Sequence, residues 1–178
     1  MITVLGTRRI YEGRVLNLRV DDVVYSNGNR SVVEVVEHNG GVCLIAQPQP
    51  TTIVLVRQFR PAIGRELWEV PAGKLDAPEE DPRAAAEREL LEETGYRCAS
   101  LKKVRTFYTA PGFCGELLHL FVAEGLTAGT PQPEADEVLH AKVFDLEEAW
   151  DMLDRDELPD AKTQIALAWA RQSVRPPL

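Results

Sequence analysis

Glu89 and Glu93 are the residues of this sequence with the clearest chemical potential. Residues four apart lie on one face of a helix, and Glu92 flanks the pair. Carboxylates at this spacing repel one another and weaken a bare helix, so a structural role alone does not favour the cluster. A divalent cation reverses that cost, because hard ions such as Mg²⁺ take carboxylate oxygens as ligands. The spacing therefore predicts a metal site.

The segment that must present these glutamates has the start and stop signals of a single helix. Asp81 suits the N-cap, and Pro82 suits the first helical position. Alanines and long side chains fill the middle, and Gly95 stands where a left-handed C-terminal cap belongs. A Glu-rich helix is ordinarily a solvated face. Here the caps, the preceding loop and a second acidic cluster at 134–137 favour the metal site instead.

The run from Arg88 to Tyr96, RELLEETGY, led by Gly73 and Glu80, resembles the Nudix box. That motif marks hydrolases that cleave a nucleoside diphosphate linked to another group. The core segment matches every fixed position, but the gap before it is one residue too long. We place the extra residue in the turn at 76–78 and take Glu80, not Glu79, as the first box glutamate. A surface turn can absorb a residue without moving the helix.

The resemblance implies a metal site for Mg²⁺ or Mn²⁺. In the family, box glutamates and a main-chain carbonyl of the preceding loop hold the ion, which here implies Glu89, Glu93 and Ala72 as ligands. Glu92 and Arg88 are implied as further catalytic residues, with Arg88 orienting the carboxylates. Gly73 follows Ala72, and we expect it to give the backbone freedom to turn.

The acidic cluster at 134–137 contains the candidates for the general base. The family often takes a catalytic or metal-binding glutamate from this loop, and Glu137, just before the next strand, is the first choice. Glu134 and Asp136 remain alternatives, because Ala135 stands where some relatives carry an acid. A solvated acidic loop is the structural alternative.

Pro111 stands fifteen residues after Tyr96, a distance that resembles the ADP-ribose pyrophosphatases within the family. Proline fixes φ, Gly112 lets the backbone approach a ligand and Phe113 offers a ring, so this loop is a candidate substrate contact. The implied reaction converts ADP-ribose to AMP and ribose 5-phosphate. The alternatives are another nucleotide sugar such as GDP-mannose, a dinucleoside polyphosphate, or a Nudix-like nucleotide sensor without turnover.

Several charged residues are candidates for substrate binding. An arginine fork can hold a phosphate and stack on a base, and the strand 53–58 leads to both Arg57 and Arg60. Strand alternation should point these two to different faces, and we favour Arg60. Glu69 either touches substrate or pairs with a nearby arginine. Arg30, after the Asn-Gly hairpin turn, is a further candidate for a phosphate contact.

The order of strands and helices predicts an α/β fold. The resemblance specifies a Nudix α/β/α sandwich with a mixed sheet at 41–178, preceded by a small antiparallel β subdomain at 1–40. Strands are expected from about residue 14 to 37, around an Asn-Gly turn, the strongest short hairpin signal. In similar enzymes such a subdomain helps to build a homodimer, so a homodimer is implied here.

Composition narrows the partners and the compartment. The 178 residues carry a net charge of −8, which argues against general nucleic-acid binding. Three widely spaced cysteines show neither metal spacing nor a disulfide framework, which favours a reducing cytoplasm. The first residues lack the apolar run of a signal peptide, and no run approaches a transmembrane length. We therefore expect a cytoplasmic enzyme with a small nucleotide substrate and no membrane partner.

Overall fold

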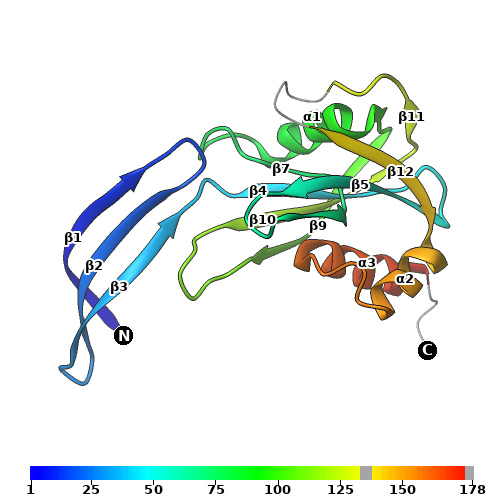
Figure 1. The fold of residues 1–178 in the computed structure, drawn as a ribbon. Helices are drawn as coiled ribbons and strands as arrows, with labels where there is room; N and C mark the ends of the chain where they lie inside the picture. The colour runs from blue at the N-terminus through cyan, green and yellow to red at the C-terminus, as the bar shows by residue number, and fades with distance from the viewer. Residues whose placement is uncertain (133–137, 175–178) are drawn as a thin grey trace.

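The computed structural model describes residues 1–132 and 138–174. An antiparallel sheet at the N-terminus forms an arm beside the rest of the chain (Figure 1). Its strands, in the order β1-β2-β3, are β1 (Ile2–Glu12), β2 (Asn17–Tyr25) and β3 (Arg30–Glu37). The Asn-Gly turn joins β2 to β3 as predicted, and Gly28 has a φ of 85°, in the left-handed region that glycine tolerates.

Strand β1 was not predicted from the sequence. Its side chains are almost all exposed, so no face of the strand carries the two-residue hydrophobic alternation that signals a strand. Its register with β2 also shifts between Val4 and Gly6 and again between Arg9 and Tyr11. Pairing with β2, rather than burial, therefore defines this strand.

The rest of the chain contains two larger sheets. The first has the order β7-β4-β10-β9, and because β4 and β10 are parallel while its other pairs are antiparallel, it is mixed. Its strands are β4 (Gly41–Ala46), β7 (Ala72–Lys74), β9 (Ser100–Tyr108) and β10 (Leu117–Glu124). The second is antiparallel, in the order β12-β5-β6, with β5 (Thr52–Arg60), β6 (Arg65–Glu69) and β12 (Leu139–Asp145). A short pair joins β8 (Tyr96–Arg97) to β11 (Thr127–Ala128).

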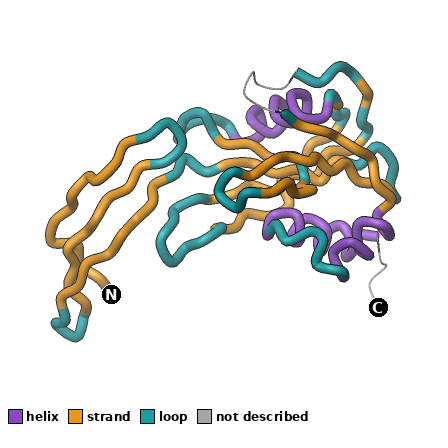
Figure 2. The backbone as a smooth tube through the Cα atoms, viewed as in Figure 1, coloured by secondary structure: helices purple, strands orange, loops and turns teal. Residues whose placement is uncertain are grey.

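Helices cover both sides of these sheets (Figures 1 and 2). Helix α1 (Pro82–Thr94) lies on one side, and α2 (Leu146–Asp154) and α3 (Ala161–Val174) lie on the other. Strand β4 is buried on both faces. Val42 and Leu44 belong to the core cluster under α1, whereas Cys43 and Ile45 belong to the cluster under α2 and α3. This alternation confirms the predicted α/β/α sandwich.

The caps of α1 are those that the sequence predicts. The Asp81 carboxylate accepts a hydrogen bond from the Arg83 backbone N–H at 3.0 Å, and Pro82 is the first helical residue. Gly95, with a φ of 75°, donates its N–H to the Leu91 carbonyl at 2.9 Å. The helix buries Ala85 and Ala86 against the sheet and, unusually, also buries Glu89 and Glu93. Buried carboxylates need partners, which directs attention to their surroundings.

The N-terminal arm is tied to the sandwich by backbone hydrogen bonds. The Val36 N–H on β3 donates to the Phe113 carbonyl at 2.7 Å, and the Gly115 N–H donates to the Val36 carbonyl at 3.0 Å. The loop between β9 and β10 therefore adds itself to the edge of β3. Across the part of the chain that the structure describes, each helix is too short or too polar to cross a lipid bilayer.

Candidate functional site

A pocket of about 540 Å³ lies where α1, the start of α3 and the β9–β10 loop converge. Gly73 and Glu89 line the end formed by the box. Arg60, Asp160 and Lys162 line a second end, and His38, Thr109 and Glu116 line the side toward the N-terminal arm. The sequence predictions and the pocket therefore share three residues, Arg60, Ala72 and Glu89.

At the box end, Gly73 makes room for Glu89. A Cβ atom added at Gly73 would overlap the Glu89 carboxylate. Gly73 lies inside β7, and its φ is outside the left-handed region, so the expectation that it provides a turn is wrong. Its function is to lack a side chain, which lets a carboxylate from α1 lie directly against the strand.

Glu93 lies one helical turn further along α1 and contacts the same strand. One of its carboxylate oxygens accepts the Ala72 N–H at 2.9 Å. The side chains of Glu89 and Glu93 are therefore both held against β7, at Gly73 and Ala72 respectively. The three residues predicted to be metal ligands are brought together, although they come from two elements.

Arg88 is the hub of the box carboxylates. Its guanidinium donates to Glu89 at 2.8 Å and to Glu92 at 3.1 Å, and it lies 3.4 Å from Glu80. Burial lowers the pKa of Arg88, but the neighbouring carboxylates, Glu89 first among them, outweigh burial and raise it above its usual range. Arg88 therefore stays charged. Glu80 also accepts the Asp76 N–H at 2.6 Å, which fits its role as the first box glutamate.

The donor set at the box end fits a hard divalent cation. Two carboxylates, Glu89 and Glu93, lie beside a strand that offers main-chain oxygens, and the Gly73 cradle keeps one of them close to that strand. Within residues 1–132 and 138–174, no group of three or more acidic, histidine or cysteine side chains is placed to hold a metal. Mg²⁺ suits such a site, because it binds one or two carboxylates and completes its shell with water and substrate phosphate.

Glu69 is the centre of a second cluster, at the α3 end of the pocket. Its side chain is 2% exposed, and the Arg60 guanidinium binds both of its oxygens, at 2.8 and 2.7 Å. The Lys162 ammonium also donates to Glu69 and lies 3.0 Å from Asp160. Burial raises the pKa of Glu69, but the two cations together lower it below its ordinary value. Glu69 therefore pairs with an arginine, one of the two readings that the sequence left open.

The two arginines of β5 point in different directions. Arg60 lines the pocket, whereas Arg57 lies 3.6 Å from Glu66 and 5.6 Å from the centre of the Trp68 ring. Strand β5 continues to Arg60, so the alternation that the sequence predicted applies to both residues.

The predicted substrate contacts Pro111, Gly112 and Phe113 are not among the residues that line the pocket, but residues that flank them are. Pro111, Gly112 and Phe113 are exposed, and the Phe113 side chain is 59% exposed. On either side of them, Thr109 and Glu116 line the pocket, and the Thr109 hydroxyl donates to Glu116 at 2.7 Å.

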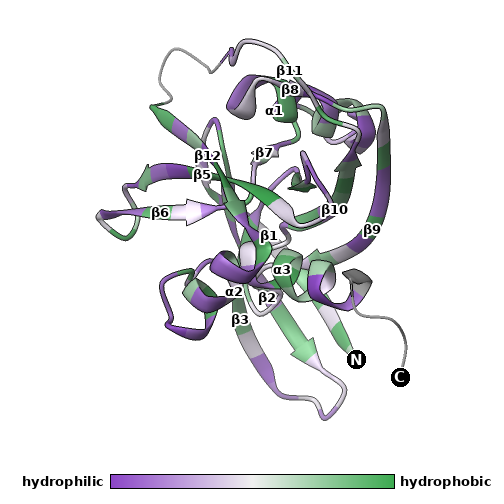
Figure 3. Cartoon of the chain, turned by 90° about the vertical axis from the view of Figure 1, so that its right-hand side faces the viewer, coloured by the Kyte–Doolittle hydropathy of each residue, from purple (hydrophilic) through white to green (hydrophobic). Residues whose placement is uncertain are grey.

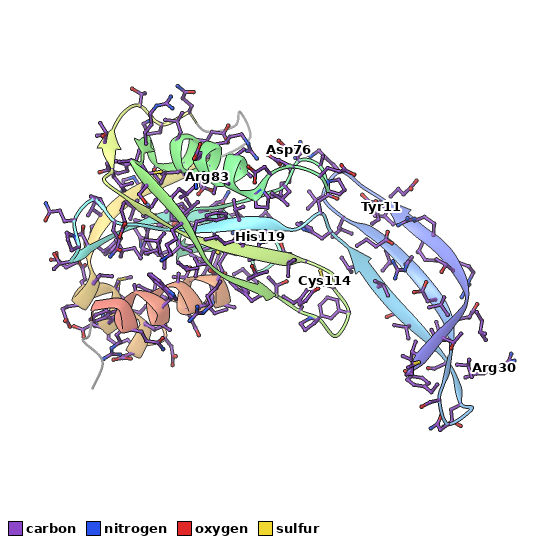
Figure 4. All side chains as sticks on the ribbon, turned by 180° about the vertical axis from the view of Figure 1, so that it is seen from behind. Tyr11, Arg30, Asp76, Arg83, Cys114 and His119 are labelled. Carbon is purple, nitrogen blue, oxygen red and sulfur yellow. The ribbon has the colours of Figure 1, made fainter. Side chains whose placement is uncertain are left out.

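Arg30 does not line the pocket of its own chain. It begins β3 near the hairpin turn, at the end of the arm, and Figure 4 shows it far from Cys114 in the β9–β10 loop. Glu137, Glu134 and Asp136 lie outside the described residues. Their proposed role in base catalysis stays a prediction.

Sequence reasoning missed the pocket residues His38, Thr109, Glu116, Asp160 and Lys162. The Nδ1 atom of His38 accepts the Gly40 N–H at 3.0 Å, and the residue also lies on the pocket wall. One local signal was available for Lys162. A cation in the first turn of a helix opposes the helix dipole, so Lys162 occupies a position that local rules disfavour.

The fold and the box define the class of protein. The NUDIX domain model matches residues 37–166, and the chain belongs to this family. It is 40% identical to the ADP-ribose pyrophosphatase of Bacillus subtilis (strain 168) over 167 residues, which covers 93% of this chain and 90% of that protein.

Two further relatives refine the comparison. The chain is 41% identical to the methanol dehydrogenase activator of Bacillus methanolicus, with the same coverage of 93% and 90%. A crystal structure of an ADP compounds hydrolase superposes with a TM-score of 0.85 at 23% identity, covering 97% of this chain and 94% of that one. At that identity the superposition establishes the fold alone.

Proposed function

We propose that this Nudix protein hydrolyses ADP-ribose to AMP and ribose 5-phosphate with Mg²⁺ or Mn²⁺ as cofactor. The observation that carries the proposal is the cradle at Gly73, in which Glu89 and Glu93 from the box helix lie against Ala72 and Gly73 beside a pocket. The similarity to an ADP-ribose pyrophosphatase across nearly the whole chain supports this substrate.

The box carboxylates and the Ala72 carbonyl would hold the cation. A divalent ion held there would neutralise diphosphate charge and would lower the pKa of water. Arg88 keeps the carboxylates in place through hydrogen bonds to Glu89 and Glu92. These contacts hold Glu89 and Glu92 in position before substrate arrives.

The reaction requires a water to lose a proton as its oxygen bonds to phosphorus and the bridging P–O bond breaks. We assign the proton acceptor to the acidic loop, with Glu137 first and Glu134 and Asp136 as alternatives. Arg60 on the pocket wall, and the loop 111–113 beside it, would hold the rest of the nucleotide. Arg57 and Arg30 are secondary candidates, because neither lines the pocket.

The test is hydrolysis of ADP-ribose with Mg²⁺ and with Mn²⁺, beside GDP-mannose, other nucleotide sugars and a dinucleoside polyphosphate. We expect metal-dependent release of AMP with ADP-ribose preferred. Preference for another compound would keep the Nudix chemistry and overturn the assigned substrate. A folded protein that binds metal and nucleotide but turns over no compound would establish the sensor alternative.

We also propose that the protein is a cytoplasmic homodimer joined through residues 1–40, the subdomain that precedes the hydrolase domain at 41–178. Exposed apolar side chains are concentrated on this arm, where Figure 3 also shows hydrophobic stretches. They are Met1, Ile2, Val4, Leu5, Ile10, Tyr11, Val15, Leu16, Tyr25 and Val32. Apolar surface of this kind marks an interaction site. The three cysteines are free, which fits a reducing compartment.

The molar mass of the protein, measured by light scattering as it elutes from a size-exclusion column, tests whether it is a dimer. The wild-type protein should have twice the mass of the 19.8 kDa chain, and Val4→Glu with Ile10→Glu should shift it toward monomer. Ile63→Glu is the matched control, because Ile63 is similarly exposed but lies in the β5–β6 turn. A wild-type mass equal to that of one chain would contradict the proposal.

A further inference from the structure

Lys162 occupies a position that its ion pairs alone do not explain. It is the second residue of α3, in the turn where the positive end of the helix dipole disfavours cations. Its carboxylate partner Glu69 already receives two hydrogen bonds from Arg60, at 2.8 and 2.7 Å, so a second cation is not needed to pair that charge. A residue that breaks a local rule and also lines a pocket is a candidate for function.

The surroundings of Lys162 place a donor at the pocket wall. Its side chain is 13% exposed and lines the same pocket as Glu89 and Arg60. An ammonium has three N–H donors. Glu69 accepts one of them and Asp160 forms an ion pair with the ammonium at 3.0 Å, and we infer that an N–H donor remains for a ligand in the pocket. The two carboxylates also fix the position of a side chain that is otherwise flexible.

The helix that carries Lys162 is itself held in place. Asp160 caps α3 by accepting the Thr163 N–H at 2.9 Å, and the Thr163 hydroxyl accepts the Val70 N–H at 3.0 Å. Val70 immediately precedes the loop that leads into β7. The lysine therefore has a fixed position relative to the box end of the pocket, as a specificity contact requires.

Charge balance indicates what kind of group Lys162 contacts. At this end of the pocket two cations, Arg60 and Lys162, face two carboxylates, Glu69 and Asp160. A balanced cluster offers no net attraction to phosphate, but it offers directed donors and acceptors. An uncharged oxygen, such as a sugar hydroxyl or a base carbonyl, suits it better than the diphosphate, which belongs at the metal end.

We propose that Lys162 is a substrate-binding residue that donates its remaining N–H to an uncharged oxygen in the sugar or base portion of the nucleotide. The inference rests on the proposed function, and it assigns one contact within that site. Glu69 is then a positioning residue, because it holds both Arg60 and Lys162 toward the pocket.

A double-mutant cycle separates this role from simple neutralisation of Glu69. We expect Lys162→Met to raise KM about tenfold and leave kcat within about twofold, the size of one good hydrogen bond. A smaller rise should remain when Lys162→Met is added to Glu69→Gln, because Glu69 positions the lysine but does not itself make the contact with substrate. If Lys162 only neutralised Glu69, the second change would have no effect in that background, and the proposal would be overturned.

Two controls complete the cycle. Lys142 lies on β12, pairs with Glu148 at 3.8 Å and does not line the pocket. Lys142→Met should therefore leave KM unchanged. Lys162→Gln keeps N–H donors for Glu69 but falls short of the pocket, so it should raise KM like Lys162→Met, and it serves if the methionine variant does not fold. Wild-type KM in a folded Lys162 variant overturns the assignment.

Salt and direct binding distinguish the remaining outcomes. The increase in KM should be the same at low and high salt, because the acceptor is uncharged; an effect that fades with salt would indicate a phosphate contact and overturn the proposal. Calorimetric titration of ADP-ribose into the wild type and Lys162→Met, in Ca²⁺ to slow turnover, gives Kd without catalysis. A wild type without hydrolysis overturns the proposed function, whereas an unchanged Kd in the variant overturns the role of Lys162.

Discussion

The two ends of the pocket are both rich in carboxylates, yet their charges are balanced differently. At the box end, Glu80, Glu89 and Glu92 share one cation, Arg88, and Glu93 lies against the Ala72 backbone. At the α3 end, Glu69 and Asp160 face Arg60 and Lys162 in equal number.

This difference in charge balance suits the two ends to different roles: the box end to binding a cation, and the α3 end to holding side chains in position. Excess negative charge on buried carboxylates is unfavourable until a cation arrives, so the box end is suited to a metal. The balanced cluster needs no additional charge and can hold side chains in fixed positions. The comparison predicts that changes at the box end reduce activity more than stability, and that removing the charge of Glu69 at the α3 end does the reverse.

The largest expected effect is that of Glu93→Gln, which keeps the shape of the side chain and removes its charge. Activity should fall by about a hundredfold or more, beyond the loss typical of residues that merely support metal ligands. The melting temperature should change little. Glu87→Gln is the matched control, because Glu87 lies on the exposed face of α1 and pairs with Arg83 at 3.3 Å. Unchanged turnover in the Glu93 variant would remove Glu93 from the metal site.

A smaller effect on activity is expected for Gly73→Ala. The new methyl group must displace the Glu89 carboxylate, and a shift of about 1 Å can cost up to about a hundredfold in rate. Stability should fall by no more than about 1 kcal/mol, because the displaced group is the end of a flexible side chain. Gly112→Ala is the control, since an added Cβ there meets no atom within 4 Å. Full activity in Gly73→Ala would show that the cradle is dispensable.

At the α3 end, Glu69→Gln should mainly affect stability. Removing one partner of a buried ion pair typically costs about 3–5 kcal/mol, and we expect about 2–3 kcal/mol here because Arg60 keeps contact with water. Urea unfolding at pH 7 measures the loss. Glu66→Gln, at an exposed pair with Arg57, should change stability by less than about 0.5 kcal/mol.

The same variant gives a pH dependence with a defined sign. The pKa of Glu69 is lowered in the folded protein, so its contribution to stability is fully present above the unfolded pKa, about 4.3. That contribution disappears as the pH falls through the folded pKa. The unfolding free energies of the wild type and Glu69→Gln should therefore converge below about pH 4.3. A difference that stays constant to pH 3 would contradict the ion-pair role.

The smallest effect tests the register of the box. Glu80→Ala removes the acceptor of the Asp76 N–H and a partner of Arg88, and should cost about 1 kcal/mol. Glu79→Ala should be nearly silent, because Glu79 is exposed. Thermal melts of the two variants, measured side by side, decide between the two alignments. A larger loss for Glu79→Ala would move the inserted residue to the other side of the turn.

Local signals predicted the elements, and long-range contacts determined the site. The caps of α1 and the divergence of Arg57 and Arg60 follow from rules that act over a few residues. The need for Gly73 comes from Glu89, sixteen positions later, and Lys162 meets Glu69 across 93 positions. No periodicity in the sequence encodes such meetings, because they depend on how sheets and helices pack.

The backbone pairing between Val36 and the β9–β10 loop also limits how the enzyme can be shortened. A truncated chain starting at Gly41 would retain the whole Nudix box. Judged only by that motif, it would be expected to be catalytically complete. It would also leave the Phe113 carbonyl and the Gly115 N–H without their partners on β3. Val36 on β3 thus supports the loop that forms one wall of the pocket, and a shortened version of this protein should keep that strand.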